Sequence, residues 1–197
     1  MKNIILKLSS AALFAALLFP ACKKGEGDPF LSLRCRKARA TGEWKMTAGT
    51  GSDTYTSGGN TTVTTTTYDG ANRTESVSFN SGTPVVTTSA YTQSLTINKD
   101  GSFTLVELDD TVTTTITGKW NFTSGVGKDS KKKERLVLYY EKIDSGGGNV
   151  MTIDGNLFIA VFEIYQLKSK EMILKFDYSN SDANSSDTTT NEWTFTQ

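Results

Sequence analysis

The sequence predicts an all-β protein, an antiparallel up-and-down β-barrel with a short N-terminal helix. From residue 41 onward, threonine, valine, tyrosine and phenylalanine occur in short runs, which is typical of strands. Clusters of glycine, aspartate and asparagine separate the runs, and no long helical period competes. Strands joined by such short turns pair antiparallel, because parallel pairing needs long crossovers. Closing the meander into a barrel then removes its exposed edges.

The first 21 residues resemble a bacterial lipoprotein signal peptide. Lys2 and Lys7 supply positive charge, and the apolar run at 11–19 is too short to span a membrane comfortably. The sequence Leu-Phe-Pro-Ala-Cys at 18–22 is similar to a lipobox. The resemblance implies cleavage before Cys22 and its lipidation, so the membrane is an expected partner through this lipid. Two or more acyl chains anchor a protein stably where one does not.

A tether and one domain are expected after the signal. Residues 22–29 are polar and glycine-rich, which is typical of a flexible tether, and residues 30–197 suit a single domain. The basic segment 30–39 predicts a helix of one to three turns that either caps the domain or rests on anionic headgroups. Cys35 is expected to be a packed or incidental thiol, because no partner motif accompanies it.

Alternation of apolar and polar residues predicts ten strands. It is clearest at 112–123, where Val112, Ile116, Trp120 and Phe122 share one face. The segments 157–166 and 171–178 are separated by a tight turn, so they should form a hairpin. Residues 49–92 contain few large apolar side chains, and we expect long hairpins there, polar on both faces. The other expected strands are 43–47, 61–68, 73–79, 85–98, 102–108, 135–142 and 188–196.

A sequence of short motifs adds a family resemblance. Gly42-Glu43-Trp44 is similar to the G-x-W motif that opens lipocalins. The segments that follow it in order are 95–104, Gly118-Lys119-Trp120, 162–167, 172–174 and 192–195. This order resembles the lipocalin-like lipoprotein domains common in Bacteroidetes, over about residues 29–197. The resemblance implies a lipocalin-like barrel that binds a small apolar or amphipathic ligand.

Two groups of residues are candidates for the barrel interior. Glycine allows a bend or a close approach, and tryptophan two residues later plugs the barrel base on the same face. The plug candidates are Gly42, Trp44, Gly118, Trp120 and Trp193, and ligand contact is the alternative role of the tryptophans. Inward aromatic residues either line a cavity or fill it, and these are Tyr140, Phe158, Phe162, Phe176 and Tyr178.

Two threonines are candidate modification sites. Thr111 and Thr188 each follow an aspartate and precede Val112 or Thr189, and these triplets resemble O-glycosylation sites of exported Bacteroidetes proteins. Glu26 and Asp28 resemble acidic surface-export signals. Lys23 differs from the aspartate that retains lipoproteins in the inner membrane. The expected location is therefore the outer membrane, on its periplasmic or cell-surface side.

Composition argues against several functions. Lysine and arginine together number 21, as do aspartate and glutamate, so no net field favours nucleic acid. Histidine is absent, which removes the usual nucleophile activation and the commonest metal ligand. We expect no enzyme, no metal and no cofactor. Two functions remain, a barrel that binds a small ligand, or a filled barrel that displays threonine-rich hairpins to partners. Interior volume distinguishes them.

Overall fold

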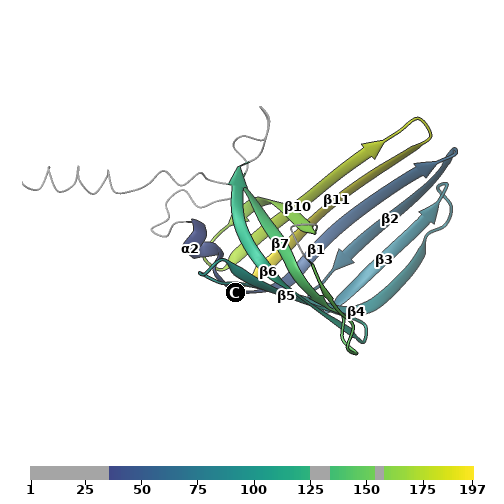
Figure 1. The fold of residues 1–197 in the computed structure, drawn as a ribbon. Coiled ribbons are helices and arrows are strands. Elements are labelled where there is room, and N and C mark those ends of the chain that lie inside the picture. Colours follow the sequence, from purple (N-terminus) through teal and green to yellow (C-terminus); the bar gives the residue numbers. More distant parts are fainter. Residues whose placement is uncertain (1–35, 125–133, 154–157) are drawn as a thin grey trace, which may run out of the picture.

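A computed structural model of the protein describes residues 36–124, 134–153 and 158–197 (Figure 1). The proposed signal at 1–21, the tether at 22–29, Cys22 and Cys35 lie outside the described residues. The elements are α2 (Arg36–Ala40), β1 (Gly42–Ser57), β2 (Asn60–Tyr68), β3 (Asn72–Phe79), β4 (Val85–Ile97), β5 (Ser102–Asp109), β6 (Val112–Ser124), β7 (Glu134–Asp144), β8 (Val150–Thr152), β9 (Ile159–Leu167), β10 (Glu171–Ser181) and β11 (Ser185–Thr196).

The strands form a closed antiparallel barrel of ten strands in up-and-down order, with one short N-terminal helix. The order is β6-β5-β4-β3-β2-β1-β11-β10-β9-β7, and pairing of β6 with β7 closes it. Among the described strands, β8 pairs with β7 alone, as a short addition outside the ring. The predicted fold class is confirmed.

Strands β2 and β3 do not reach the base of the barrel. The first residues of β1 pair directly with the end of β4, with Gly42 opposite Ile97 and Trp44 opposite Leu95. The ring at the base therefore consists of β1, β4, β5, β6, β7, β9, β10 and β11, and β2 with β3 is inserted above it. At the base, the inward side chains meet one another across a narrow interior.

Helix α2 lies at the base, on the opposite side of the barrel from the free ends of β1 and β2 (Figure 1). Its last residue, Ala40, is buried, and the indole N–H of Trp44 donates to the Ala40 carbonyl at 2.7 Å. The amine of Lys37 lies 5.5 Å from the ring centre of Trp120. Helix and barrel are thus joined by specific contacts. Among the described residues, no helix combines the length and apolar character that crossing a membrane requires.

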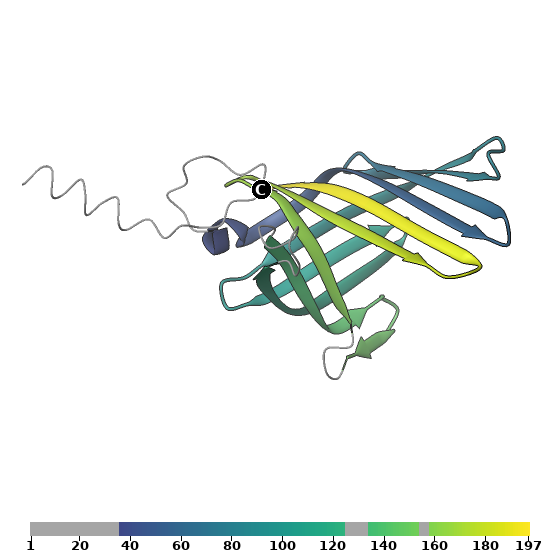
Figure 2. The same ribbon diagram turned by 90° about the horizontal axis from the view of Figure 1, so that it is seen from above.

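Beyond the base ring, β1, β4, β10 and β11 continue and form, together with β2 and β3, an open sheet that we call the wing (Figures 1 and 2). No residue of the wing is buried. The sheet order within it is β4, β3, β2, β1, β11 and β10. The wing is made of residues 50–57 of β1, all of β2 and β3, 85–90 of β4, 176–181 of β10 and 185–192 of β11.

The two faces of the wing differ in composition, because residues paired across antiparallel strands lie on the same face. One face continues the barrel interior and is here called the aromatic face. It carries Tyr55, Val77, Phe79, Val85 and Tyr178, all more than a third exposed. The other, the threonine face, carries Thr50, Thr54, Thr65, Thr67, Thr74, Thr88, Thr188 and Thr190.

The wing corrects two details of the sequence prediction. The hairpins of residues 49–92 extend from the barrel as predicted, but they are not polar on both faces. Strand β1 continues to Ser57 and β11 begins at Ser185, so both are longer than expected. The glycines that ended the predicted first strand have a packing role, since a Cβ on Gly49 would lie 2.9 Å from ring carbons of both Trp193 and Tyr68.

Candidate functional site: the barrel cavity

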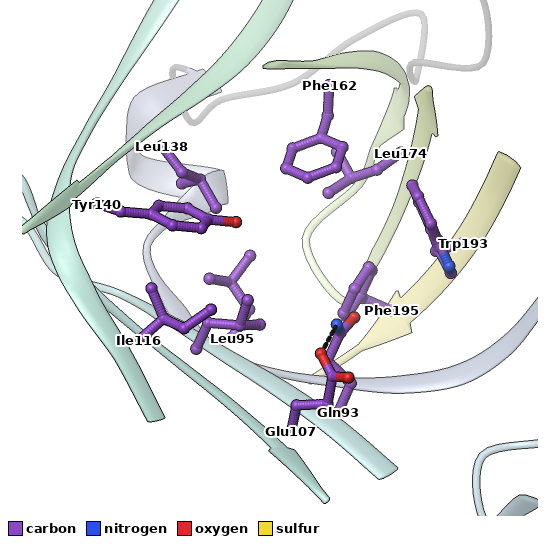
Figure 3. Close-up of a pocket in the computed structure, with 11 residues that line it drawn as sticks. Gln93, Leu95, Glu107, Ile116, Leu138, Tyr140, Phe162, Leu174, Trp193 and Phe195 are labelled. Carbon is purple, nitrogen blue, oxygen red and sulfur yellow. Dashed lines mark hydrogen bonds between the residues drawn. The ribbon is translucent and has the colours of Figure 1, made fainter. Parts of the chain in front are cut away.

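The barrel encloses a cavity of about 150 Å³ between its base and its mouth (Figure 3). Side chains of β4, β6 and β7 lie on one side, and the mostly aromatic side chains of β9, β10 and β11 lie on the other (Figure 3). The lining residues are Gln93, Leu95, Leu105, Glu107, Ile116, Leu138, Tyr140, Phe162, Leu174, Trp193 and Phe195.

The inward-facing residues of β5 lie at successive depths between the base and the mouth. Phe103 is buried at the base, Leu105 lines the middle of the cavity, and Glu107 lies two residues nearer the mouth. Phe162 and Trp193 meet edge to face with ring centres 5.8 Å apart. The floor and sides are thus apolar, and polar groups gather where the cavity opens.

The polar groups of the wall form a hydrogen-bonded chain. The side-chain N–H of Gln93 donates to the Tyr91 hydroxyl at 3.3 Å and to a Glu107 carboxylate oxygen at 3.5 Å. Figure 3 shows the hydrogen bond to Glu107. The Glu107 carboxylate still has acceptor capacity beside the cavity. A ligand with a hydrogen-bond donor at one end could satisfy it.

A second layer of aromatic and charged groups surrounds the mouth. The rings of Tyr68 and Tyr91 are 5.0 Å apart, and the Arg73 guanidinium lies 5.5 Å from the Tyr91 ring centre. Arg73 also forms an ion pair with Asp109 at 2.9 Å. Burial raises the pKa of the Tyr91 phenol far above its usual range, and the negative charge of Glu107 adds to this effect. Tyr91 is therefore neutral and can act as a hydrogen-bond donor.

The five predicted cavity aromatics fall into two groups. Tyr140 and Phe162 line the cavity, and burial raises the pKa of the Tyr140 phenol. Phe158 and Tyr178 are about half exposed, at 50% and 45%, and Phe176 lines a separate groove where the pairing of β9 with β10 ends. These three lie outside the cavity because β10 extends beyond the mouth and β9 begins there.

The predicted plug residues lie at two levels. Trp44 and Trp120 are buried at the base, and the Trp120 indole donates to the Asn98 carbonyl at 2.8 Å. Trp193 lies higher and forms part of the cavity wall. Its position there is compatible with the alternative role of ligand contact.

Each glycine of the plug motifs has its own structural reason, a close contact at Gly118 and an unusual backbone angle at Gly42. A Cβ on Gly118 would lie 1.9 Å from the Tyr139 carbonyl oxygen, so glycine is required at this bulge between β6 and β7. Gly42 has a φ of +143°, a conformation that side chains rarely adopt.

The remaining candidates lie on the surface or outside the described residues. Thr111 is exposed in the turn between β5 and β6, and Thr188 is exposed on the threonine face. Their glycosylation stays a prediction, as does lipidation at Cys22. In the described ranges, no three His, Cys, Asp or Glu side chains gather as metal ligands would.

Sequence reasoning missed the polar part of the site. Gln93 and Glu107 face the interior from β4 and β5, where they are cross-strand partners. A signal was present, since Phe103, Leu105 and Glu107 follow the inward alternation of one strand. An acidic residue at an inward position is unusual, because a buried charge is costly without partners.

The chain was compared with known proteins. No protein-family model matches it. No curated protein matches it, and no solved structure does either. The comparisons therefore identify no family, and the chain is described by its own architecture, an antiparallel β-barrel of ten strands.

Proposed function

We propose that the chain is an exported, lipid-anchored binding protein whose barrel holds the apolar part of a small amphipathic ligand. The apolar cavity with one acidic group at its open end is the observation that carries this proposal. The signal-like residues 1–21 and Cys22 support the anchoring part. The expected location is the outer membrane.

The cavity volume limits what it can hold. Ligand sites in proteins usually measure about 300 to 1,000 Å³. A dry cavity near 150 Å³ holds about one benzene-sized ring. We infer that the apolar end of the ligand enters the barrel and that any larger remainder extends through the mouth.

Polar groups at the mouth suggest the chemistry of the other end. The Glu107 carboxylate lines the cavity and accepts hydrogen bonds. A hydroxyl or amine attached to an apolar ring or short chain matches this acceptor. A carboxylate ligand does not match, because it would face Glu107 with like charge.

The first experiment is native mass spectrometry of the full chain carrying Cys22→Ser, followed by organic extraction. A defined extra mass that extraction removes would establish a bound ligand and give its class. A titration with toluene, benzyl alcohol and benzylamine, followed by tryptophan fluorescence, then tests the cavity directly. Trp193 in the cavity wall provides the signal.

Matched variants locate the site. Ile116→Phe fills the cavity and should abolish binding of all three probes, whereas Val77→Phe on the exposed aromatic face should not. Glu107→Gln keeps the size of the side chain and should weaken benzylamine more than toluene. If no probe saturates and no ligand co-purifies, the proposal of a binding cavity is wrong.

The second candidate function is an interaction module that displays the wing. The observation that favours it is the absence of any buried residue in the wing, which places both of its faces in contact with solvent. Such a sheet contributes little to a core and presents a large surface to partners. The double substitution Tyr55→Ser and Phe79→Ser, on the exposed aromatic face, would abolish partner binding under this candidate and leave probe binding in the cavity unchanged.

A further inference from the structure

The wing has a free edge along β4. Residues 85–90 pair with β3 on one side, and pairing with β5 begins only at Tyr91, opposite Asp109. Within the described part of the chain, no strand pairs with 85–89 on the other side. A free edge presents unpaired backbone donors and acceptors to other chains.

The hydrogen bonds at the barrel end of this edge show which residues face outward. The N–H of Tyr91 donates to the Ala71 carbonyl on the β3 side at 2.8 Å. Ala90 therefore points its backbone groups away from β3, and both bond to Asp110, its carbonyl at 2.8 Å and its N–H at 3.2 Å. Because backbone direction alternates along a strand, Val86 and Thr88 also face outward.

These constraints leave one best register for a self-pairing. Pro84, the next outward position, has no N–H, and Ala90 is already bonded to Asp110. Only Val86 and Thr88 offer both a free N–H and a free carbonyl. We propose that the β4 edge pairs antiparallel with the β4 edge of a second copy of this chain, across a two-fold axis at Thr87. Val86 of each copy then lies opposite Thr88 of the other.

Charge favours a second copy over a charged partner. No charged side chain occurs between Ser76 and Asn98, so two identical β4 edges meet without like-charge repulsion. The opposite free edge of the wing, in β10, carries Asp177, the kind of charge that protects an edge. Val85 and Val86 are 67% and 61% exposed and would lose apolar surface to water on pairing.

The two-fold axis fixes the arrangement of the copies. The strands of the joined wings run antiparallel, so the two barrels lie at opposite ends of one continuous sheet. Each barrel keeps its cavity, because the paired segment lies in the wing. The pairing is therefore independent of the proposed ligand site.

The test measures the mass of the full chain with Cys22→Ser and Cys35→Ser by sedimentation at increasing concentration. Val86→Pro removes an outward N–H, and Thr88→Lys places a charge next to the axis, opposite Val86 of the other copy. Each substitution occurs twice in the dimer, so each should weaken dimerisation at least about tenfold. The matched controls Ser179→Pro on the β10 edge and Thr65→Lys inside the threonine face should change it by no more than about twofold.

A cross-link gives a second readout that does not depend on these variants. Thr87 would face its own copy as a non-hydrogen-bonded pair, whose Cβ atoms are about 4.5 to 5.5 Å apart. Thr87→Cys in the same background should form a disulfide-linked dimer on mild oxidation, and Ser179→Cys should not. A protein that stays monomeric at its highest soluble concentration, with Cys at 87 unlinked, would overturn the proposal.

Two further outcomes would also overturn it. A dimer that persists in both Val86→Pro and Thr88→Lys uses another surface. Open polymers that Ser179→Pro weakens as strongly as Val86→Pro would indicate pairing of β4 with β10, which is not a closed two-fold contact.

Discussion

The barrel and the wing share strands β1, β4, β10 and β11, yet only in the barrel does an opposite wall face the inward side chains. In β1, Trp44 and Met46 are buried at the base, while Tyr55, on the same face nearer the tip, is 47% exposed. Local alternation is similar in both parts. The difference is that the barrel brings opposite walls together, whereas the wing has no second layer. Inward side chains are buried where the strands close into a barrel. Alternation along a strand does not by itself bury them.

The largest expected contrast comes from removing one phenylalanine in each region. Phe103→Ala empties the barrel base, where Phe103 is 1% exposed, and should lower the free energy of unfolding by about 3 to 5 kcal/mol. Phe79→Ala in the wing, where the ring is 58% exposed, should change it by no more than about 0.5 kcal/mol. Urea unfolding followed by circular dichroism measures both. Equal losses would show that the wing has a core of its own.

A smaller effect should come from the contact between helix and barrel. Trp44→Phe keeps an aromatic ring but leaves the buried Ala40 carbonyl without its indole donor, which should cost about 1 to 3 kcal/mol. Hydrogen exchange should then rise in α2 and β1 near the base. The control Tyr55→Phe removes an exposed wing hydroxyl and should leave exchange unchanged. Faster exchange confined to the wing in Trp44→Phe would contradict the assigned contact.

Alkaline pH should lower the free energy of unfolding through Tyr91, at the mouth of the barrel. Burial raises the pKa of Tyr91 in the folded protein, so its stabilising effect is complete below the unfolded pKa of 10.0 and is lost as pH rises above it. Unfolding free energy should fall by about 1.4 kcal/mol for each pH unit above 10 from this group alone. Tyr91→Phe should reduce that slope in urea titrations at pH 9 to 11. An unchanged slope would mean that Tyr91 ionises while folded.

The smallest effect concerns two acids in the wing. Partial burial and the neighbouring Asp53 raise the pKa of Asp187, so its ionisation works against folding once pH exceeds the unfolded value. Asp187→Asn should slow amide exchange in the wing at pH 7 and have no such effect at pH 3, where the carboxyl is protonated. Slower exchange at both values would point to packing rather than charge as the cause.

Much of the barrel was predictable because its residues obey simple alternation. Strand β6 and the hairpin of β9 with β10 were anticipated from apolar residues at every second position, and the buried Trp44 and Trp120 from glycine two residues earlier. The wing was predicted less well. Gly49 and Gly51 look like strand ends, yet a Cβ on Gly49 would meet Trp193 and Tyr68. That requirement arises from neighbouring strands and cannot be read from β1 alone.

The candidate site was only partly predictable for a similar reason. Tyr140 and Phe162 were assigned to the cavity by their inward position, and both line it. Phe158 and Tyr178 have the same local pattern but lie where the barrel has opened. How far a strand continues beyond the closed barrel depends on the strands that pair with it. Alternation therefore predicts which face a residue lies on, but not its position between the base and the tip.

The position of α2 sets the direction in which the molecule extends. The chain enters the barrel at the base through α2, and the wing leaves from the opposite end (Figure 1). Strand β1, with 16 residues, spans about 50 Å at the usual rise of a β-strand. Any attachment upstream of α2 would therefore join the molecule at the base of the barrel. Its cavity would open away from the attachment point, and the tips of the wing would reach farthest from it.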